Sequence, residues 1–255
     1  MILAWDNKAD AAMLSTDSEL ASLPASNVQQ PHVSRKWHTA AGVKSAYLLM
    51  DMGASVSCGV AALLGTNLTS AATLRLRGSD SDPTGVTGEE YDTGTISAGV
   101  VSGYGEAYKS FTDAAARYWR LDLADATVPS NLQIGRVFLG PKWSPSVNQE
   151  FGWSVVSVDS SDLDESYGKQ EYADEKPQQR VIQFTFNWMN EAEMYGNAFA
   201  LARANGRVRD VLAIHDIAGA YLSQQAVWGL VQASEPLIHE RAKIYRTKFT
   251  IKERL

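Results

Sequence analysis

The sequence predicts a mainly β protein: a jelly-roll sandwich in the N-terminal half, followed by a β-barrel or β-sheet module with one α-helix. Residues 1–145 contain short alternating apolar and polar runs, separated by clusters of Gly, Ser, Asp and Pro. Runs of this kind without long amphipathic helices are typical of antiparallel sandwiches. Residues 146–255 contain longer alternating runs and one segment with helical periodicity. We therefore expect two domains, 1–145 and 146–255.

The clearest strands of the first half are divided by turn-forming clusters. The clusters are GSDSDPTG (78–85) and ATVPSN (126–131), which supply the glycine, proline and short polar residues that chain reversals require. The predicted strands are AYLLMDMG (46–53), ATLRLRGS (72–79), RYWRLDLA (117–124) and LQIGRVFLG (132–140).

The stretch ARYWRLDLAD alternates bulky apolar side chains with charged ones. If it is a strand, Trp119, Leu121 and Leu123 share one face, which we expect to fill the sandwich. Arg120 and Asp122 then lie on the outer face, about 7 Å apart along the strand. At that spacing an ion pair with a neighbouring strand is favoured over catalysis.

The segment between the two halves is rich in proline and then in acidic residues. GPKWSPS (140–146) carries two prolines, and DSSDLDES (159–166) follows it closely. A calcium loop is one interpretation of the acidic run, but the EF-hand order of ligands and its central glycine are absent. We expect a solvated linker or loop.

The first strand of the second half is VIQFTFNWM (181–189). Its alternation predicts that one face enters the core and the other carries polar residues. Burial of such aromatic side chains contributes roughly 1.5–3 kcal/mol each. The predicted core residues are Ile182, Phe184, Phe186 and Trp188.

A helix is predicted over 190–205. Asn190 is a suitable N-cap, Glu193 completes a capping box, and Gly206 suits the position after the last turn. The predicted apolar stripe contains Tyr195, Phe199 and Ala202, with Met194, Ala198 and Leu201 beside it. Further strands are expected at VRDVLAIHD (208–216), QAVWGLVQA (225–233) and AKIYRTKFTIKE (242–253).

Composition and charge argue against several classes of protein. The net charge of −6 disfavours a dedicated nucleic-acid binder. The single cysteine, Cys58, excludes an internal disulfide and a cysteine-built zinc site, and we expect it to be buried. No signal peptide and no apolar run of about 20 residues is visible, so a soluble protein made in a cytoplasm is expected.

The residues that carry chemistry form no recognisable catalytic arrangement. The four histidines do not make an HExxH pair, and neither a Gly-x-Ser-x-Gly turn nor a phosphate-binding glycine loop is present. His215 and Asp216 are adjacent, so on a strand they would face opposite sides. We expect no enzymatic activity, no catalytic residues, no cofactor and no metal.

The first half resembles the discoidin branch of galactose-binding-like sandwiches. SNVQQPHVSRKWHTA resembles that family's early loop and its tryptophan-containing element, with Trp37 in the aromatic position. YLLMDMGASVSCGVAALLGTNL, ATLRLRGSDSD, ARYWRLDL and IGRVFLG are similar to later strands, in the same order. The resemblance covers about 140 residues and implies a galactose-binding-like jelly-roll sandwich.

The second half resembles the β-barrel-plus-helix modules of bacteriophage tail-tip and baseplate proteins. The matching features are an R-x-I-x-F-x-F strand, an acidic helix start, a glycine-terminated helix, VLAIHD, VWGLV and a last strand ending in Glu. The combination resembles a distal-tail or upper-baseplate protein of a long-tailed phage. Many such proteins place the barrel first, whereas here the sandwich comes first.

These resemblances imply a structural protein that is made in the host bacterial cytoplasm and located in the virion tail. Its partners would be copies of itself in a ring, a hexamer or a trimer, and neighbouring tail or baseplate proteins. No membrane and no sequence-specific nucleic acid is expected as a partner. The alternative is a glycan-binding module that recognises a host-surface carbohydrate through the sandwich.

Two sets of residues are candidates for contacts with partners. Basic residues crowd the last strand, where one face would carry Arg246, Lys248 and Lys252 opposite Tyr245, Phe249 and Ile251. Either they protect an exposed edge strand from unwanted pairing, or they dock an acidic partner or the next protomer. Possible ligand contacts in loops of the sandwich are Trp37, His38, Asp80, Asp82, Tyr104 and Tyr108.

Overall fold

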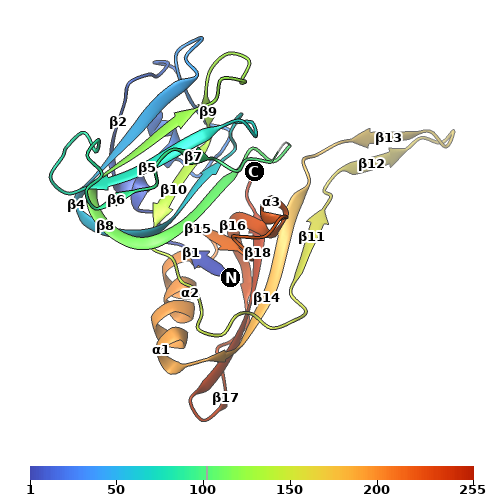
Figure 1. Ribbon diagram of the computed structural model, residues 1–255. Coiled ribbons are helices and arrows are strands. Elements are labelled where there is room, and N and C mark those ends of the chain that lie inside the picture. The colour runs from blue at the N-terminus through green and yellow to red at the C-terminus, as the bar shows by residue number, and fades with distance from the viewer. Residues whose placement is uncertain (102) are drawn as a thin grey trace. The chain divides into compact units, whose positions relative to one another are not determined.

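The computed structural model describes residues 1–101 and 103–255, and it is mainly β, as predicted. The chain divides into two compact units (Figure 1). The sandwich unit comprises Ala4–Lys142 and Ile217–Ser223, and the sheet unit comprises Met1–Leu3, Trp143–Asp216 and Gln224–Leu255. Among the described residues, no helix combines the length and apolar composition needed to cross a membrane.

The sandwich unit is built on two long strands, β4 (Ser45–Leu64) and β8 (Ala107–Ala124), rather than on the short strands expected from the sequence. The remaining strands and 3-10 helices are η1 (Lys8–Ala11), β2 (Met13–Thr16), η2 (Ala25–Gln29), β3 (Trp37–His38), β5 (Thr73–Ser79), β6 (Tyr91–Asp92), β7 (Ile96–Ser97), β9 (Gln133–Ile134) and β10 (Arg136–Gly140).

β4 and β8 pair antiparallel along their whole length and bend together. The register shifts between Asp51 and Val56, and again between Cys58 and Val60. Gly53 lies in the first shift with φ +75°, a conformation that favours glycine. Such bulges bend strands, so the N-terminal half of β4 pairs with β2 while its C-terminal half pairs with β10.

The core of the sandwich unit lies between the two halves of these bent strands. In β8, Trp119, Leu121 and Leu123 are buried, which confirms the face predicted from ARYWRLDLAD. Phe111, from the other half of β8, lies 6.0 Å from Trp119 between ring centroids. Cys58 is also fully buried, as predicted, and burial raises the pKa of its thiol to about 12.

The sheet unit contains a sheet in the order β1-β15-β16-β18-β14-β11, with β17 also paired to β18. Its elements are β1 (Ile2–Ala4), β11 (Ser154–Val158), β12 (Asp162–Glu165), β13 (Glu171–Asp174), β14 (Gln179–Met189), α1 (Glu191–Glu193), the π-helical turn Met194–Ala198, α2 (Phe199–Asn205), β15 (Asp210–Ile214), α3 (Leu222–Gln225, at the junction of the units), β16 (Ala226–Ser234), β17 (Ile238–Arg241) and β18 (Ile244–Glu253).

The prediction that Trp188 of β14 lies in the core is wrong. Ile182, Phe184 and Phe186 are buried, but the side chain of Trp188 is 55% exposed. A bulge between Phe186 and Met189 inserts one extra residue relative to β18. Because side chains alternate along a strand, this insertion turns Met189 inward and Trp188 outward.

The predicted helix is present and continuous over 191–205, although its middle turn is π-helical. The capping box is confirmed: the Glu193 amide donates to Asn190 Oδ1 at 2.9 Å, and the Asn190 amide donates to Glu193 Oε2 at 3.3 Å. The predicted stripe is displaced, because Met194, Ala198 and Leu201 are buried whereas Tyr195 and Phe199 are exposed.

The acidic run predicted as a loop or linker is a β-hairpin. β12 and β13 pair only with each other, and all eight of their residues are exposed. Figure 1 shows them as a two-stranded ribbon beyond β11. We call residues 159–176 the acidic arm. The acidic composition of this run predicted a loop, so the strand that contains Leu163 was missed.

The capping box gives a test of the helix. Asn190→Ala removes the acceptor for the Glu193 amide, so we expect the free energy of unfolding to fall by about 1 kcal/mol in urea denaturation. Asn190→Ser keeps a side-chain acceptor, so its free energy of unfolding should fall by much less. An equal loss in both variants would show that the cap hydrogen bond is not what stabilises this end.

Candidate functional site

Two of the six loop residues predicted to contact a ligand are buried and cannot do so. Trp37 is fully buried, and its indole N–H donates to the Ser18 carbonyl at 3.1 Å. Tyr108 is 3% exposed, and its hydroxyl donates to Glu106 Oε2 at 2.7 Å. Trp37 belongs to the core of the sandwich unit, whereas Tyr108 is buried on the opposite face of β8 from Ala107.

His38 is half-buried, and it is opposite Gln133 in the two-stranded sheet of β3 and β9. Burial lowers the pKa of the imidazole, with a smaller contribution from Lys36. Tyr104 is 38% exposed. These two residues remain accessible to solvent, but they lie far along the chain from the acidic pair at Asp80 and Asp82.

Asp80 and Asp82 hold the loop in which they lie. Asp80 accepts the backbone N–H of Arg117 at 2.8 Å. Asp82 accepts the N–H groups of Thr84, Val86 and Thr87. Hydrogen bonds from Thr84 and the other loop donors lower the pKa of Asp82 to about 2. Asp82 therefore accepts hydrogen bonds within its own loop, while Asp80 joins the loop to β8, so a structural role is favoured for both.

The strand register does not gather the six residues in one place. Asp80 follows β5 beside the bend of β4, where Ser79 is opposite Tyr118. Tyr108 is opposite Ala62, toward the other end of the long strands.

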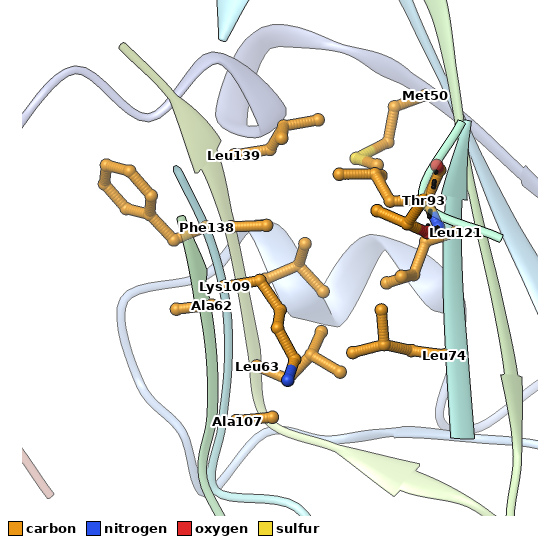
Figure 2. Close-up of a pocket in the computed structure, with 13 residues that line it drawn as sticks. Met50, Ala62, Leu63, Leu74, Thr93, Ala107, Lys109, Leu121, Phe138 and Leu139 are labelled. Atoms are coloured by element: carbon orange, nitrogen blue, oxygen red, sulfur yellow. Dashed lines mark hydrogen bonds between the residues drawn. The ribbon is translucent and has the colours of Figure 1, made fainter. Parts of the chain in front are cut away.

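An apolar cavity lies between the two halves of the sandwich. Figure 2 shows apolar side chains from both sides, among them Met50, Leu74 and Leu139, pointing into it. Its volume is about 20 Å³, which is room for about one water molecule. Lys109 lies along it, and burial lowers the pKa of the ammonium group. The cavity is a packing space and is too small for a sugar.

A polar hollow of about 250 Å³ lies on the outer face of β4, β8 and β5. The register aligns Ser45, Ala124 and Thr73 in one row across these strands. The small Ala124 side chain leaves space between the two hydroxyls, and Thr95 adds a third. The volume is below the roughly 300–1,000 Å³ of pockets for drug-sized ligands, so the hollow suits one small ring.

Charged side chains form the next part of this face. Asp122 accepts from Arg77 at 2.6 Å and from Arg120 at 2.9 Å. Arg75 makes a two-point contact with Asp92 at 2.9 and 2.6 Å. The cross-strand pairing predicted for Asp122 is confirmed. A carboxylate has about four acceptor positions, so Asp122 can accept further hydrogen bonds from a ligand in the hollow.

Most residues of the hollow were missed from the sequence. The alternation in ATLRLRGS places Thr73, Arg75 and Arg77 on one face, which was a usable signal. Nothing in the sequence indicates that Thr95 lies beside them, or that Ala124 leaves a space, because both depend on which strands pair.

His215, which the sequence places beside Asp216, lies in an aromatic contact. The His215 ring stacks on Trp153 with centroids 3.8 Å apart and contacts Gln149. Burial lowers the pKa of this imidazole. Among the described residues, no three acidic, histidine or cysteine side chains are grouped as metal ligands.

The basic residues of the last strand lie on one face, as predicted. Burial alternates strictly along β18, with Arg246, Lys248 and Lys252 half-exposed and Tyr245, Phe249 and Ile251 buried. The edge-strand interpretation is wrong, because β18 is interior and pairs with both β14 and β16. The helix covers the opposite face, where Tyr195 contacts Tyr245 with ring centroids 5.7 Å apart.

No protein-family model matches the chain, and no curated protein sequence matches it. Solved structures with a similar fold include carbohydrate-binding modules. Chitosan-binding module 1 from the chitosanase/glucanase of Paenibacillus sp. IK-5 is 18% identical, with a TM-score of 0.42 over 53% of this chain and 99% of that module. A Streptococcus pneumoniae fucose-binding module is 13% identical, with a TM-score of 0.41 over 53% and 95%.

The lectin-binding domain of lectinolysin, in complex with Lewis b, is 17% identical, with a TM-score of 0.42 over 54% of this chain and 96% of that domain. All three TM-scores are below 0.5, and the sugars named are properties of those modules.

The loop carboxylates give the sandwich unit a pH dependence. Arg75 and the loop amides lower the pKa values of Asp92 and Asp82 to about 2, from 3.8. A lowered folded-state pKa contributes stability above the unfolded value, and this is lost as pH falls. We expect the free energy of unfolding to decrease from pH 4 to pH 2 in urea titrations, and less so in Asp92→Asn.

The matched control is Asp164→Asn, which changes a carboxylate of the acidic arm that makes no ion pair with a described residue. It should keep the wild-type pH profile. An Asp92→Asn profile parallel to the wild type would contradict the role given to Arg75.

Proposed function

We propose that the chain is a non-enzymatic structural protein that assembles with copies of itself into a ring and serves as a platform for neighbouring proteins. The observation that carries this proposal is the acidic arm, whose strands β12 and β13 are exposed at every residue. The proposed setting is the tail tip or baseplate of a long-tailed phage, and it rests on the sequence resemblances of the two halves.

An isolated two-stranded hairpin is marginally stable in water. Among the described residues, β12 and β13 pair with no third strand. The stability of this hairpin therefore depends on contacts outside the described part of the chain. In an assembly, a neighbouring subunit supplies such contacts.

Exposed apolar side chains continue along the arm and into the adjacent edge strand. Leu163 is 72% exposed, Tyr172 59%, and Tyr167 at the hairpin turn is fully exposed. In β11, Val155 and Val156 are 40% and 51% exposed. Contiguous exposed apolar residues commonly mark interaction sites, and tyrosine is enriched at interfaces.

β11 also ends the sheet of the sheet unit, and within the described part of the chain it pairs with β14 alone. Its other side offers unpaired backbone groups, which can pair with another chain. The arm and this edge therefore each offer groups that a protein partner can contact.

Self-association can be measured directly. We expect the purified chain to form a ring of defined copy number in negative-stain images and light scattering. Replacing Leu163, Tyr167 and Tyr172 with Ser should give a folded monomer, because these side chains supply the apolar part of the contact. Met13→Ser, at a position 77% exposed in the sandwich unit, should leave the ring intact. A monomer at every concentration tested would refute the proposal.

A second candidate function, glycan recognition by the sandwich unit, is favoured by the polar hollow. Its hydroxyls on Ser45, Thr73 and Thr95 and the carboxylate of Asp122 are the kinds of group that hydrogen-bond a sugar ring. No side-chain hydrogen bond within the described chain occupies the hydroxyls of Ser45 and Thr95, so both can serve a ligand.

A glycan array and calorimetry test this function. If a sugar binds in the hollow, Ser45→Ala combined with Thr95→Val should weaken binding by about thirtyfold, since each of the two lost hydrogen bonds contributes about 1 kcal/mol. Ser70→Ala, which removes an exposed hydroxyl elsewhere, should bind as the wild type does. No saturable binding to any glycan would refute this second function and leave the assembly proposal unaffected.

A further inference from the structure

We propose that the acidic arm of one copy docks onto the basic face of β18 in the next copy. This inference rests on the self-association proposed above and identifies the two surfaces that meet. The basic face consists of Arg246, Lys248 and Lys252 on β18, together with Arg241 and Lys243 at the adjoining β17–β18 turn.

The arm has a large excess of negative charge. Residues 159–176 contain seven carboxylates and two lysines. Both lysines are already paired within the arm: Lys169 lies 2.6 Å from Glu165, and Lys176 contacts Asp162. The other carboxylates form no ion pair with a described residue, so their charge is available to a partner.

The pairing of β12 with β13 makes this charge costly for the isolated arm. Asp162 is directly opposite Asp174, and Glu165 is directly opposite Glu171. Like charges at opposite positions destabilise an antiparallel pair. Lys176 and Lys169 offset one carboxylate of each pair, Asp162 and Glu165. A cationic surface against the arm would offset the other carboxylate of each pair, so the hairpin suits a basic partner.

The basic face is the complementary surface on the same chain. Arg246 and Lys248 reach carboxylates of their own unit only at 3.9 Å, from Glu240 and Glu235 respectively. Exposed ion pairs at that separation contribute little. Arg241 and Lys243 are exposed and form no ion pair with a described residue. These cations occur in a chain whose net charge is −6, which makes their clustering distinctive.

The two surfaces are different parts of one chain, and no ion pair joins them within the described residues. If the arm of each copy binds the strand of the next copy in turn, the contact is heterologous. Heterologous contacts form a ring when their rotation closes. Complementary charge also accelerates association and fixes the register of the contact. The apolar side chains of the arm then supply contacts that salt does not screen.

Charge reversal on each surface tests this docking. In one variant Asp164, Glu171, Asp174 and Glu175 are replaced with Lys, which makes the arm basic, and in the other Arg241, Arg246, Lys248 and Lys252 are replaced with Glu, which makes the face acidic. Each variant alone should assemble only at concentrations about tenfold or more above the wild type, because like charges now meet. Arg35→Glu, an exposed reversal in the sandwich unit, is the control, and thermal melts should show that all variants are folded.

Mixing the two variants gives the decisive measurement. The basic arm of one then meets the acidic face of the other, and the acidic arm meets the basic face, so assembly should return with the copies alternating. Restored assembly supports the docking. If either variant assembles like the wild type, or if both fail and the mixture also fails, the docking is wrong although self-association stands. If the wild-type chain stays monomeric, the proposal of self-association is itself wrong.

Discussion

The antiparallel pairing of β4 with β8 is the constraint on which the sandwich unit depends. Both strands are far longer than the usual strand, and their two register shifts bend the pair so that each half belongs to a different layer. β2, β5 and β10 are added to this pair, and the core is enclosed between its halves. The bend brings Phe111 onto Trp119, and such aromatic pairs contribute about 0.5–1.5 kcal/mol beyond their burial.

The same pairing determines what the outer face of the sandwich unit can do. Since the register aligns Ser45, Ala124 and Thr73, the polar side chains of three strands meet around one small residue. Asp122 accepts hydrogen bonds from two arginines, so the orientation of its side chain is fixed. A ligand would meet a preorganised set of groups, which lowers the entropic cost of binding.

Side-chain alternation allowed much of the fold to be predicted. It identified the buried face of 117–124, the core of 181–189 as far as Phe186, the capped helix and the two faces of the last strand. Trp188 was misassigned because a bulge is a property of two paired strands and leaves no mark in one of them. The location of β18 in the sheet interior, and the hollow over Ala124, equally depend on strand order, which single-sequence periodicity does not contain.

The acidic run shows the limit of a different kind of argument. Polar composition predicted a solvated segment, and every residue there is exposed, yet the segment forms paired strands with like charges opposed. A hairpin that opposes its own charges is poorly suited to stand alone. Its sequence is better explained by a basic surface elsewhere, and the interior strand β18 presents one on a rigid sheet. That arrangement leaves the outer face of the sandwich unit free for a separate partner, so assembly and recognition can reside in different units of one chain.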